Sequence, residues 1–372
     1  MEEHAKIYVA GHRGLVGSAI KKALKDKGYQ NLIYKASKEL DLRRQSDTEE
    51  FFQKESPEYV FLAAAKVGGI LANDTYKAEF IYDNMAIAIN IIQSSYKYGV
   101  KKLLNLGSSC IYPKFAPQPM KEQFLLTGPL EPTNEPYAIA KISAIKLVRY
   151  YNEQYGTNFL SVMPTNLYGP NDNFNLETAH VLPALIRKFH LAKLLREGTL
   201  EALEADIRRF PLGFGLDREA ENHKIDNLPH TLSKLGIFKD KVALWGSGEV
   251  YREFLFVEDL AEACVFLMEN FNAWDLSARH PLSPKKVTST LSLEDYFLNI
   301  GTGEDIKVKD LAQMIKEIVG FKGDIFFDSS KPDGTPKKLL DVTNIKSLGW
   351  QAKTSLEEGI IKTYTWYKAL DS

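Results

Sequence analysis

A tyrosine and a lysine lie four residues apart in the segment Y-A-I-A-K, at Tyr137 and Lys141. In a helix this spacing places both side chains on one face. The pKa of free tyrosine is about 10, and a nearby ammonium group lowers it because the cation favours the phenolate. Such a pair would serve as a general acid and base near neutral pH. The same spacing is also common on surface helices without any catalytic role.

Ser108 favours the catalytic interpretation of this pair. It follows an apolar segment at residues 102–106 that predicts a strand. Doubly wound sheets bind their ligands outside the carboxyl ends of the strands. We therefore expect Ser108, Tyr137 and Lys141 to share one site at that edge of a sheet.

Three glycines, Gly11, Gly14 and Gly17, form the segment G-H-R-G-L-V-G near the start of the chain. They follow a predicted strand at 6–10 and open a predicted helix at 16–27. Glycines let the chain turn tightly and let backbone N–H groups approach a pyrophosphate, whose charge the helix N-terminus favours. The spacing is G-x-x-G-x-x-G, and its place between a strand and a helix predicts a dinucleotide site.

The residues after the second strand, at 31–34, indicate which dinucleotide binds. Lys35 and Lys38 come first, no acid appears before Glu39, and Arg13 lies within the glycine loop. An acid at this place holds the ribose 2′-hydroxyl of NAD, whereas a 2′-phosphate requires a cation. The sequence therefore favours NADP(H). The alternative is that both lysines are only solvated, as most lysines are.

The elements that would position these residues alternate along the first part of the chain. Strands are predicted at 6–10, 31–34, 59–64, 102–106 and 159–163, and helices at 16–27, before Pro57, before Gly99 and at 137–155. This alternation predicts an α/β fold with a Rossmann-type doubly wound parallel sheet. We expect residues 1–165 to form the NADP-binding domain, to which a segment around 250–270 returns.

A smaller α/β substrate-binding lobe is expected over residues 166–372. It would include helices at 308–319 and 356–367. A charged stretch at 196–239 and a stretch at 273–293 without clear periodicity are interpreted as insertions. The first could form a lid, contribute to an oligomer interface or extend into solvent.

The composition limits the class of protein. Of 372 residues, 44% are apolar and 26% charged, and the formal net charge is −1. This balance is typical of a globular protein and gives no general attraction to nucleic acid or to anionic membranes. We see no secretory signal and no apolar stretch long enough to span a bilayer. Cys110 and Cys264 suit a reducing compartment, so a cytoplasmic enzyme without a metal site is expected.

Together the serine, the tyrosine-lysine pair and the glycines resemble the extended short-chain dehydrogenase/reductase family. The similarity is most specific in AGHRGLVGSAI, AAAKVGGI, GSSCIYPKFAPQP with LEPTNEPYAIAK, MPTNLYGPNDNF, WGSG with REFLFVEDLA, and KPDGTPKKLLD. These segments resemble the family members that act on a 4-keto-6-deoxy sugar carried on GDP. The resemblance implies C3/C5 epimerisation of GDP-4-keto-6-deoxy-D-mannose, NADPH-dependent reduction at C4, and a homodimer formed through long helices.

The resemblance also implies a role for each catalytic residue. Ser108 would hydrogen-bond the substrate oxygen, Tyr137 would exchange the proton, and Lys141 would bind the nicotinamide ribose. Epimerisation needs one group to remove a proton beside the ketone and another to return one to the opposite face, and these would be Cys110 and His180. Both residue types titrate near neutral pH, although either one can also be structural. Cys264 is assigned to the core.

Ligand contacts are implied residue by residue. The expected cofactor contacts are Gly11, His12, Arg13, Gly14, Leu15, Val16, Gly17, Lys35, Asp41, Leu42, Leu106, Gly107, Lys141, Pro164, Thr165, Asn166, Leu167 and His180. The expected substrate contacts are Lys188, Trp245, Arg252 and Asp333. A cation can meet a diphosphate, an indole can pack on a sugar or base, and a carboxylate can accept from N–H or hydroxyl groups.

Three other functions remain open at this stage. The nearest is another sugar-nucleotide enzyme of the same family, such as a 4,6-dehydratase or a 4-epimerase. Family members that resemble the dehydratases carry acidic residues after the catalytic serine or threonine, where this chain has Ser109 and Cys110, so the acid needed to eliminate water is missing. A longer sugar such as a 6-deoxy-heptose changes the shape of the pocket more than the chemistry. A catalytically silent NADP-binding scaffold is permitted by the fold alone.

Overall fold

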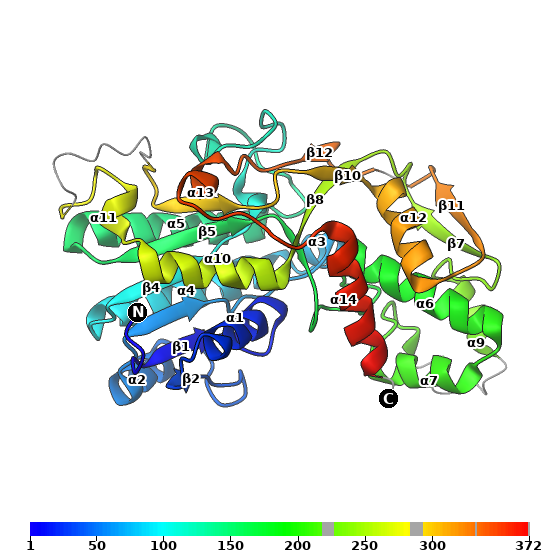
Figure 1. Ribbon diagram of the computed structural model, residues 1–372, viewed down its shortest axis with the longest axis horizontal. Coiled ribbons are helices and arrows are strands. Elements are labelled where there is room, and N and C mark those ends of the chain that lie inside the picture. Colours follow the sequence, from blue (N-terminus) through cyan, green and yellow to red (C-terminus); the bar gives the residue numbers. More distant parts are fainter. Residues whose placement is uncertain (218–226, 283–292, 332, 371–372) are drawn as a thin grey trace.

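The computed structural model describes residues 1–217, 227–282, 293–331 and 333–370. Figure 1 shows two lobes side by side, with the N-terminal sheet in one and the C-terminal helix in the other. A sheet of six strands forms the centre of the first lobe. Its order is β2 (Leu32–Ile33), β1 (Ile7–Ala10), β3 (Tyr59–Leu62), β4 (Lys102–Leu106), β5 (Phe159–Pro164) and β9 (Phe297–Ile300).

Every strand pair in this sheet is parallel. Strands β1, β3, β4 and β5 are buried along their whole length, because helices cover both faces. Helix α1 (Leu15–Asp26) packs against α10 (Val257–Asn270), while α4 (Lys77–Lys97) packs against α5 (Glu135–Tyr155) and α2 (Gln45–Glu55). The predicted Rossmann-type doubly wound sheet is confirmed.

The second lobe contains two smaller sheets. β7 (Lys241–Trp245) pairs with β11 (Asp324–Asp328), and β8 (Tyr251–Phe256) pairs with β6 (Asn166–Tyr168), β10 (Asp305–Lys307) and β12 (Lys337–Lys338). Around them lie α6 (Val181–Glu197), α7 (Leu200–Arg209), α9 (Leu228–Ser233), α12 (Val308–Val319) and α14 (Leu356–Ala369). Short elements complete the description: α3 (Ile70–Thr75), η1 (Ser109–Ile111), η2 (Glu122–Phe124), α11 (Ala273–Leu276) and α13 (Thr343–Ser347).

Two hydrophobic clusters correspond to the two lobes. The chain returns to the first cluster over a longer stretch than 250–270, because β9 pairs with β5 and Trp350 is buried in the same cluster. The described part of 273–293 also packs there, through Ala273 and Leu276.

The described parts of the stretch at 196–239, residues 196–217 and 227–239, pack into the second lobe. Leu203, Leu212, Leu228 and Leu232 lie in the second hydrophobic cluster. Helix α7 is joined to α6 by a buried ion pair between the Arg187 guanidinium and Asp206, with an Nε to Oδ1 distance of 3.0 Å. Residues 218–226 and 283–292 fall outside the described part of the chain.

Candidate functional site

The glycine loop connects β1 to α1, and two of its glycines are required by contacts within the protein. Gly11 has a φ of +83°, and a Cβ there would lie 2.7 Å from the Ala64 backbone nitrogen. A Cβ on Gly17 would lie 2.2 Å from the Gly11 carbonyl oxygen. These clashes allow only glycine, because the opposing atoms belong to the backbone.

Gly14 differs from the other two glycines. It precedes α1 with a φ of −78°, which any residue adopts, and a Cβ there would meet nothing closer than the Gly11 oxygen at 3.6 Å. The protein itself would tolerate a methyl group at this place. The space in front of Gly14, at the N-terminus of α1, therefore fits the close approach of a pyrophosphate.

Two of the cationic side chains that were expected to contact the cofactor are available to bind a phosphate other than the pyrophosphate. Arg13 is exposed and Lys35 is half-buried, and neither forms an ion pair with any residue that the structure describes. Asp41, by contrast, is held by Arg43 at 2.9 Å, and this bond lowers the pKa of Asp41 to about 2. The free cations fit a ribose 2′-phosphate better than a 2′-hydroxyl.

The remaining expected cofactor contacts lie along one edge of the sheet. Leu106 ends β4 and is followed by Gly107, while Pro164 ends β5 and is followed by Thr165. Asn166 and Leu167 belong to β6, and Leu15 and Val16 open α1. His12 is buried beside the Tyr34 ring, with 4.7 Å between the ring centroids, and the Leu42 carbonyl accepts from Asn90 at 2.9 Å.

Tyr137 and Lys141 occupy the first turns of α5, next to the loop that carries Ser108. The Lys141 Nζ lies 5.7 Å from the centroid of the Tyr137 ring and donates to the Leu106 carbonyl at 2.7 Å. Burial lowers the pKa of Lys141 to about 8. The hydrogen bond to Leu106 ties the catalytic helix to the end of β4.

The sequence predicts that Lys141 lowers the pKa of Tyr137, and for this arrangement the prediction is wrong. Burial raises the pKa of Tyr137 above its ordinary value, Cys110 adds to the rise, and a hydrogen bond with Ser108 acts in the opposite direction. Removing the phenolate from water costs more than the Ser108 hydrogen bond returns. The phenol is therefore protonated at neutral pH.

Cys110 lies in η1, two residues after Ser108. Its backbone N–H donates to the Ser108 Oγ at 3.3 Å, and its Sγ accepts a hydrogen bond from the Asn134 side chain at 3.4 Å. The structure thus brings Ser108, Cys110, Tyr137 and Lys141 together. Cys264 is fully buried in α10, as expected for a core residue.

His180 immediately precedes α6. The preceding loop is held by the Gly69 N–H, which donates to the Thr178 carbonyl at 2.8 Å, so the A-A-A-K-V-G-G-I segment lies against it. The imidazole is exposed, yet surrounding protein lowers its pKa. An exposed side chain with many protein atoms around it is typical of the wall of a cleft. Because its pKa is lowered, the His180 imidazole is mainly neutral at pH 7.

The four expected substrate contacts gather around β7 and β8 in the second lobe. Lys188 on α6 donates to the Ala243 carbonyl at 3.5 Å, and burial lowers its pKa to about 8. Trp245, at the end of β7, is 67% exposed and so is free to pack on a ligand. Asp333 accepts from Ser247 Oγ at 2.7 Å, and Arg252 donates to the Thr335 carbonyl at 2.6 Å.

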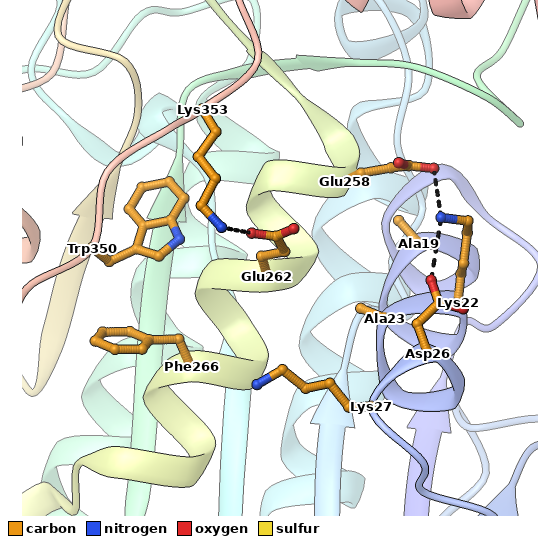
Figure 2. A pocket seen from close by; sticks show the side chains of 10 residues that line it. All are labelled: Ala19, Lys22, Ala23, Asp26, Lys27, Glu258, Glu262, Phe266, Trp350 and Lys353. Atoms are coloured by element: carbon orange, nitrogen blue, oxygen red, sulfur yellow. Dashed lines mark hydrogen bonds and ion pairs between the residues drawn. The ribbon is translucent and has the colours of Figure 1, made fainter.

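Figure 2 shows a different pocket, of about 340 Å³, between α1, α10 and the segment that carries Lys353. Most of its charged side chains pair with each other: Lys22 lies 3.3 Å from both Asp26 and Glu258, and Lys353 lies 2.7 Å from Glu262. Lys27 pairs instead with Glu269, outside the pocket lining. None of the proposed catalytic residues lines it. The pocket therefore belongs to the packing that holds α1, and with it the glycine loop, against α10.

Two residues near the site were missed by the sequence analysis. Asn134 contacts Cys110, and Lys331 lies over the Trp245 ring at 5.7 Å from its centroid. Both stand inside segments that carried the family resemblance. Within the described ranges there is no cluster of acidic, histidine and cysteine side chains suited to a metal ion, and no helix long and apolar enough to cross a bilayer.

Comparisons with known proteins agree with this geometry. A GDP-L-fucose synthase 1 from Arabidopsis thaliana is 48% identical over 98% of this chain and 94% of its own length. A GDP-6-OMe-4-keto-L-xylo-heptose reductase from C. jejuni is 40% identical, with a TM-score of 0.88 over 100% of this chain and 99% of its own. A GDP-mannoheptose C4 reductase from Campylobacter jejuni with NADP bound is 38% identical, with a TM-score of 0.80 over 99% of each chain.

The family model described as the NAD dependent epimerase/dehydratase family matches residues 7–206 and 202–276. These matches include the glycine loop, the serine and the tyrosine-lysine pair. The chain therefore belongs to the NAD dependent epimerase/dehydratase family.

Proposed function

We propose that this protein epimerises GDP-4-keto-6-deoxy-D-mannose at C3 and C5 and then reduces it at C4 with NADPH, giving GDP-L-fucose. The observation that carries this proposal is the position of Cys110, which lies beside Ser108 and interacts with Tyr137. A reductase alone would need only the serine, tyrosine and lysine. A thiol at the same place provides a base for a proton beside the ketone.

Epimerisation comes first. Cys110 as thiolate removes the proton from C3, and the electrons move onto the C4 oxygen to give an enolate. The Ser108 and Tyr137 hydroxyl groups donate hydrogen bonds to that oxygen and stabilise its charge. The imidazolium form of His180, which is a minor fraction at pH 7, returns a proton to the opposite face. Proton exchange with solvent then restores the thiolate and the imidazolium, and the same exchange at C5 completes the inversion.

Reduction follows in the same site. NADPH supplies the hydride that adds to C4. Tyr137 gives its proton to the oxygen as the hydride arrives, and its raised pKa keeps this proton in place until then. An alkoxide is more basic than a phenolate, so the transfer is favourable. Lys141 would hold the nicotinamide ribose, and the hydrogen bond to the Leu106 carbonyl keeps the lysine side chain in position.

The sugar nucleotide would be held by the second lobe. Lys188 and Arg252 meet the diphosphate, Trp245 packs on the ligand, and Asp333 accepts from hydroxyl or ring N–H groups. The exposed face of Trp245 and the burial of both cations support these assignments. Burial strengthens the attraction for a doubly charged ligand because less water screens it.

A reductase of a GDP-heptose that performs no epimerisation is the second candidate. The structural likeness to the heptose reductase, at a TM-score of 0.88, favours it. Two measurements separate the candidates. NADPH oxidation is followed by absorbance with each GDP-4-keto sugar, and deuterium uptake at C3 and C5 is followed in heavy water by mass spectrometry.

The outcomes are distinct. Turnover of the 6-deoxyhexose with deuterium at both carbons supports the proposal. Turnover of a heptose without exchange supports the reductase, and stable absorbance with every sugar supports a silent scaffold and contradicts both.

A cytoplasmic homodimer completes the proposal. Both cysteines are free thiols, which suits a reducing compartment. Helices α4 and α5 expose aromatic side chains on their outer faces, including Tyr82, Tyr150 and Tyr155. Light scattering coupled to gel filtration would test the dimer, and Tyr150→Glu should shift the mass toward that of a monomer.

A further inference from the structure

The amide of Asn134 contacts the sulfur of Cys110. The Nδ2 to Sγ distance is 3.4 Å, which is within range for a hydrogen bond to sulfur. Asn134 lies immediately before α5, while Cys110 lies in η1 after β4, and the two elements pack together. The contact therefore joins two segments that both contribute to the site.

Helix capping does not explain this asparagine. Asn134 occupies the N-cap position of α5, where its side-chain oxygen would normally accept from a backbone N–H of the first turn. Its side chain makes no such bond, and Pro136 at the second helical position has no N–H to offer. The Asn134 Oδ1 is buried and has no partner among the residues that the structure describes.

We propose that Asn134 is a positioning residue for epimerisation, whose amide donates to the Cys110 sulfur and so stabilises the thiolate that removes the sugar proton. This inference rests on the proposed function. A donor aimed at a charged form favours that form over the neutral one.

The surroundings of Cys110 make this donor important. The titratable groups on α5 beside this loop are Tyr137 and Lys141, and the Lys141 ammonium is already bonded to the Leu106 carbonyl. Tyr137 is protonated near neutral pH because burial raises its pKa. The amide of Asn134 is thus a fixed donor to the sulfur that does not change its charge with pH.

Two variants separate positioning from capping. Aspartate matches asparagine in shape and is an equally favoured N-cap, but it has no N–H to donate. Asn134→Asp should therefore keep α5 and lose the donor, while Asn134→Ala loses both. Asn270→Ala is the matched control, because Asn270 bonds through its amide to the Phe266 carbonyl at 2.8 Å on the exposed end of α10.

The first readout needs no sugar. The alkylation rate of Cys110 by iodoacetamide is measured against pH, and the fully buried Cys264 is protected. A hydrogen bond to a charged group corresponds to about one unit on the pH scale. We expect the midpoint of the profile to rise by about one unit in Asn134→Ala, by more in Asn134→Asp, and not at all in the control.

The second readout is deuterium exchange at C3 and C5. At pH 7 we expect the rate in Asn134→Ala to fall about tenfold, because the thiolate fraction falls with the shift of about one unit. Raising the pH should restore most of this rate. A capping residue would not show such recovery.

Several results would overturn the inference. If Asn134→Asp folds and keeps the wild-type alkylation profile, the amide does not stabilise the thiolate. If both variants exchange deuterium at the wild-type rate, the contact has no role in epimerisation. If the wild-type protein exchanges no deuterium, the proposed function fails, but the alkylation profiles still decide whether the contact acts on the thiol.

Discussion

Alanine at Gly17 should destabilise the fold, whereas alanine at Gly14 should leave the stability nearly unchanged and remove cofactor binding. A methyl group at Gly17 would lie 2.2 Å from the Gly11 oxygen, whereas one at Gly14 would lie 3.6 Å from it. The first position is closed by the protein's own backbone. The second position is open unless a ligand fills it. The two variants therefore distinguish a glycine that the fold itself requires from a glycine that a bound pyrophosphate requires.

The magnitudes follow from these distances. Overpacking at Gly17 costs about 1–3 kcal/mol, and relief requires movement of backbone atoms, which the improved helix propensity of alanine offsets by only about 1 kcal/mol. The net cost of up to about 2 kcal/mol should lower the Tm of Gly17→Ala by up to roughly 4 °C. Gly14→Ala should change the stability by less than about 1 kcal/mol, because an N-cap alanine is only mildly unfavourable relative to glycine.

The assay is thermal unfolding with and without NADPH. A ligand at about 100 times its Kd stabilises the folded state by about 2.7 kcal/mol, which should raise the Tm of the wild type by several degrees. Gly14→Ala should unfold at the wild-type temperature and gain nothing from NADPH. If Gly14→Ala is stabilised as much as the wild type, the pyrophosphate does not approach at Gly14.

Further predictions concern the chemistry of the site. Tyr137→Phe should remove most C4 reduction and leave NADPH binding intact, as nicotinamide fluorescence would report. Cys110→Ser should block deuterium uptake at C3 and C5, and full-rate exchange would show that its assigned role is wrong. If two cations bind the 2′-phosphate, joint substitution of Arg13 and Lys35 by alanine should reduce the affinity for NADPH at least tenfold more than the affinity for NADH. Equal losses of affinity would contradict that argument. GDP affinity, measured by calorimetry, should fall as the pH rises above about 8, because Lys188 loses its charge there. Lys188→Arg should remove this dependence, since arginine stays charged.

The first lobe could be predicted closely from the sequence because its strands are buried on both faces and its helices end at glycines. The strand expected at 102–106 is observed as β4, and the helix expected at 308–319 is observed as α12. Ser108 after a strand and the glycines between a strand and a helix were enough to place a site at the sheet edge. The positions of the lysines at 35 and 141 follow from the same elements.

Other features could not be predicted from the sequence. The stretch at 196–239 contains helix-like pieces, but their place in the fold could not be predicted, since α7 and α9 bury leucines that come together only in the folded lobe. The direction in which the pKa of Tyr137 shifts depends on burial and on which group the Lys141 ammonium is bonded to. Neither can be read from the spacing of the two residues. Asn134 was missed because an asparagine before a helix normally indicates a cap.

The ion pair between Arg187 and Asp206 limits how this protein can be shortened. Arg187 lies beside Lys188 on α6, the helix that begins just after His180, and its guanidinium is fully buried. Removing α7 to make a smaller enzyme would leave that charge without its carboxylate, at a cost of about 3–5 kcal/mol. Loss of that support would loosen the helix that carries Lys188, the proposed anchor for the diphosphate. Deletion of α7 should thus impair substrate binding.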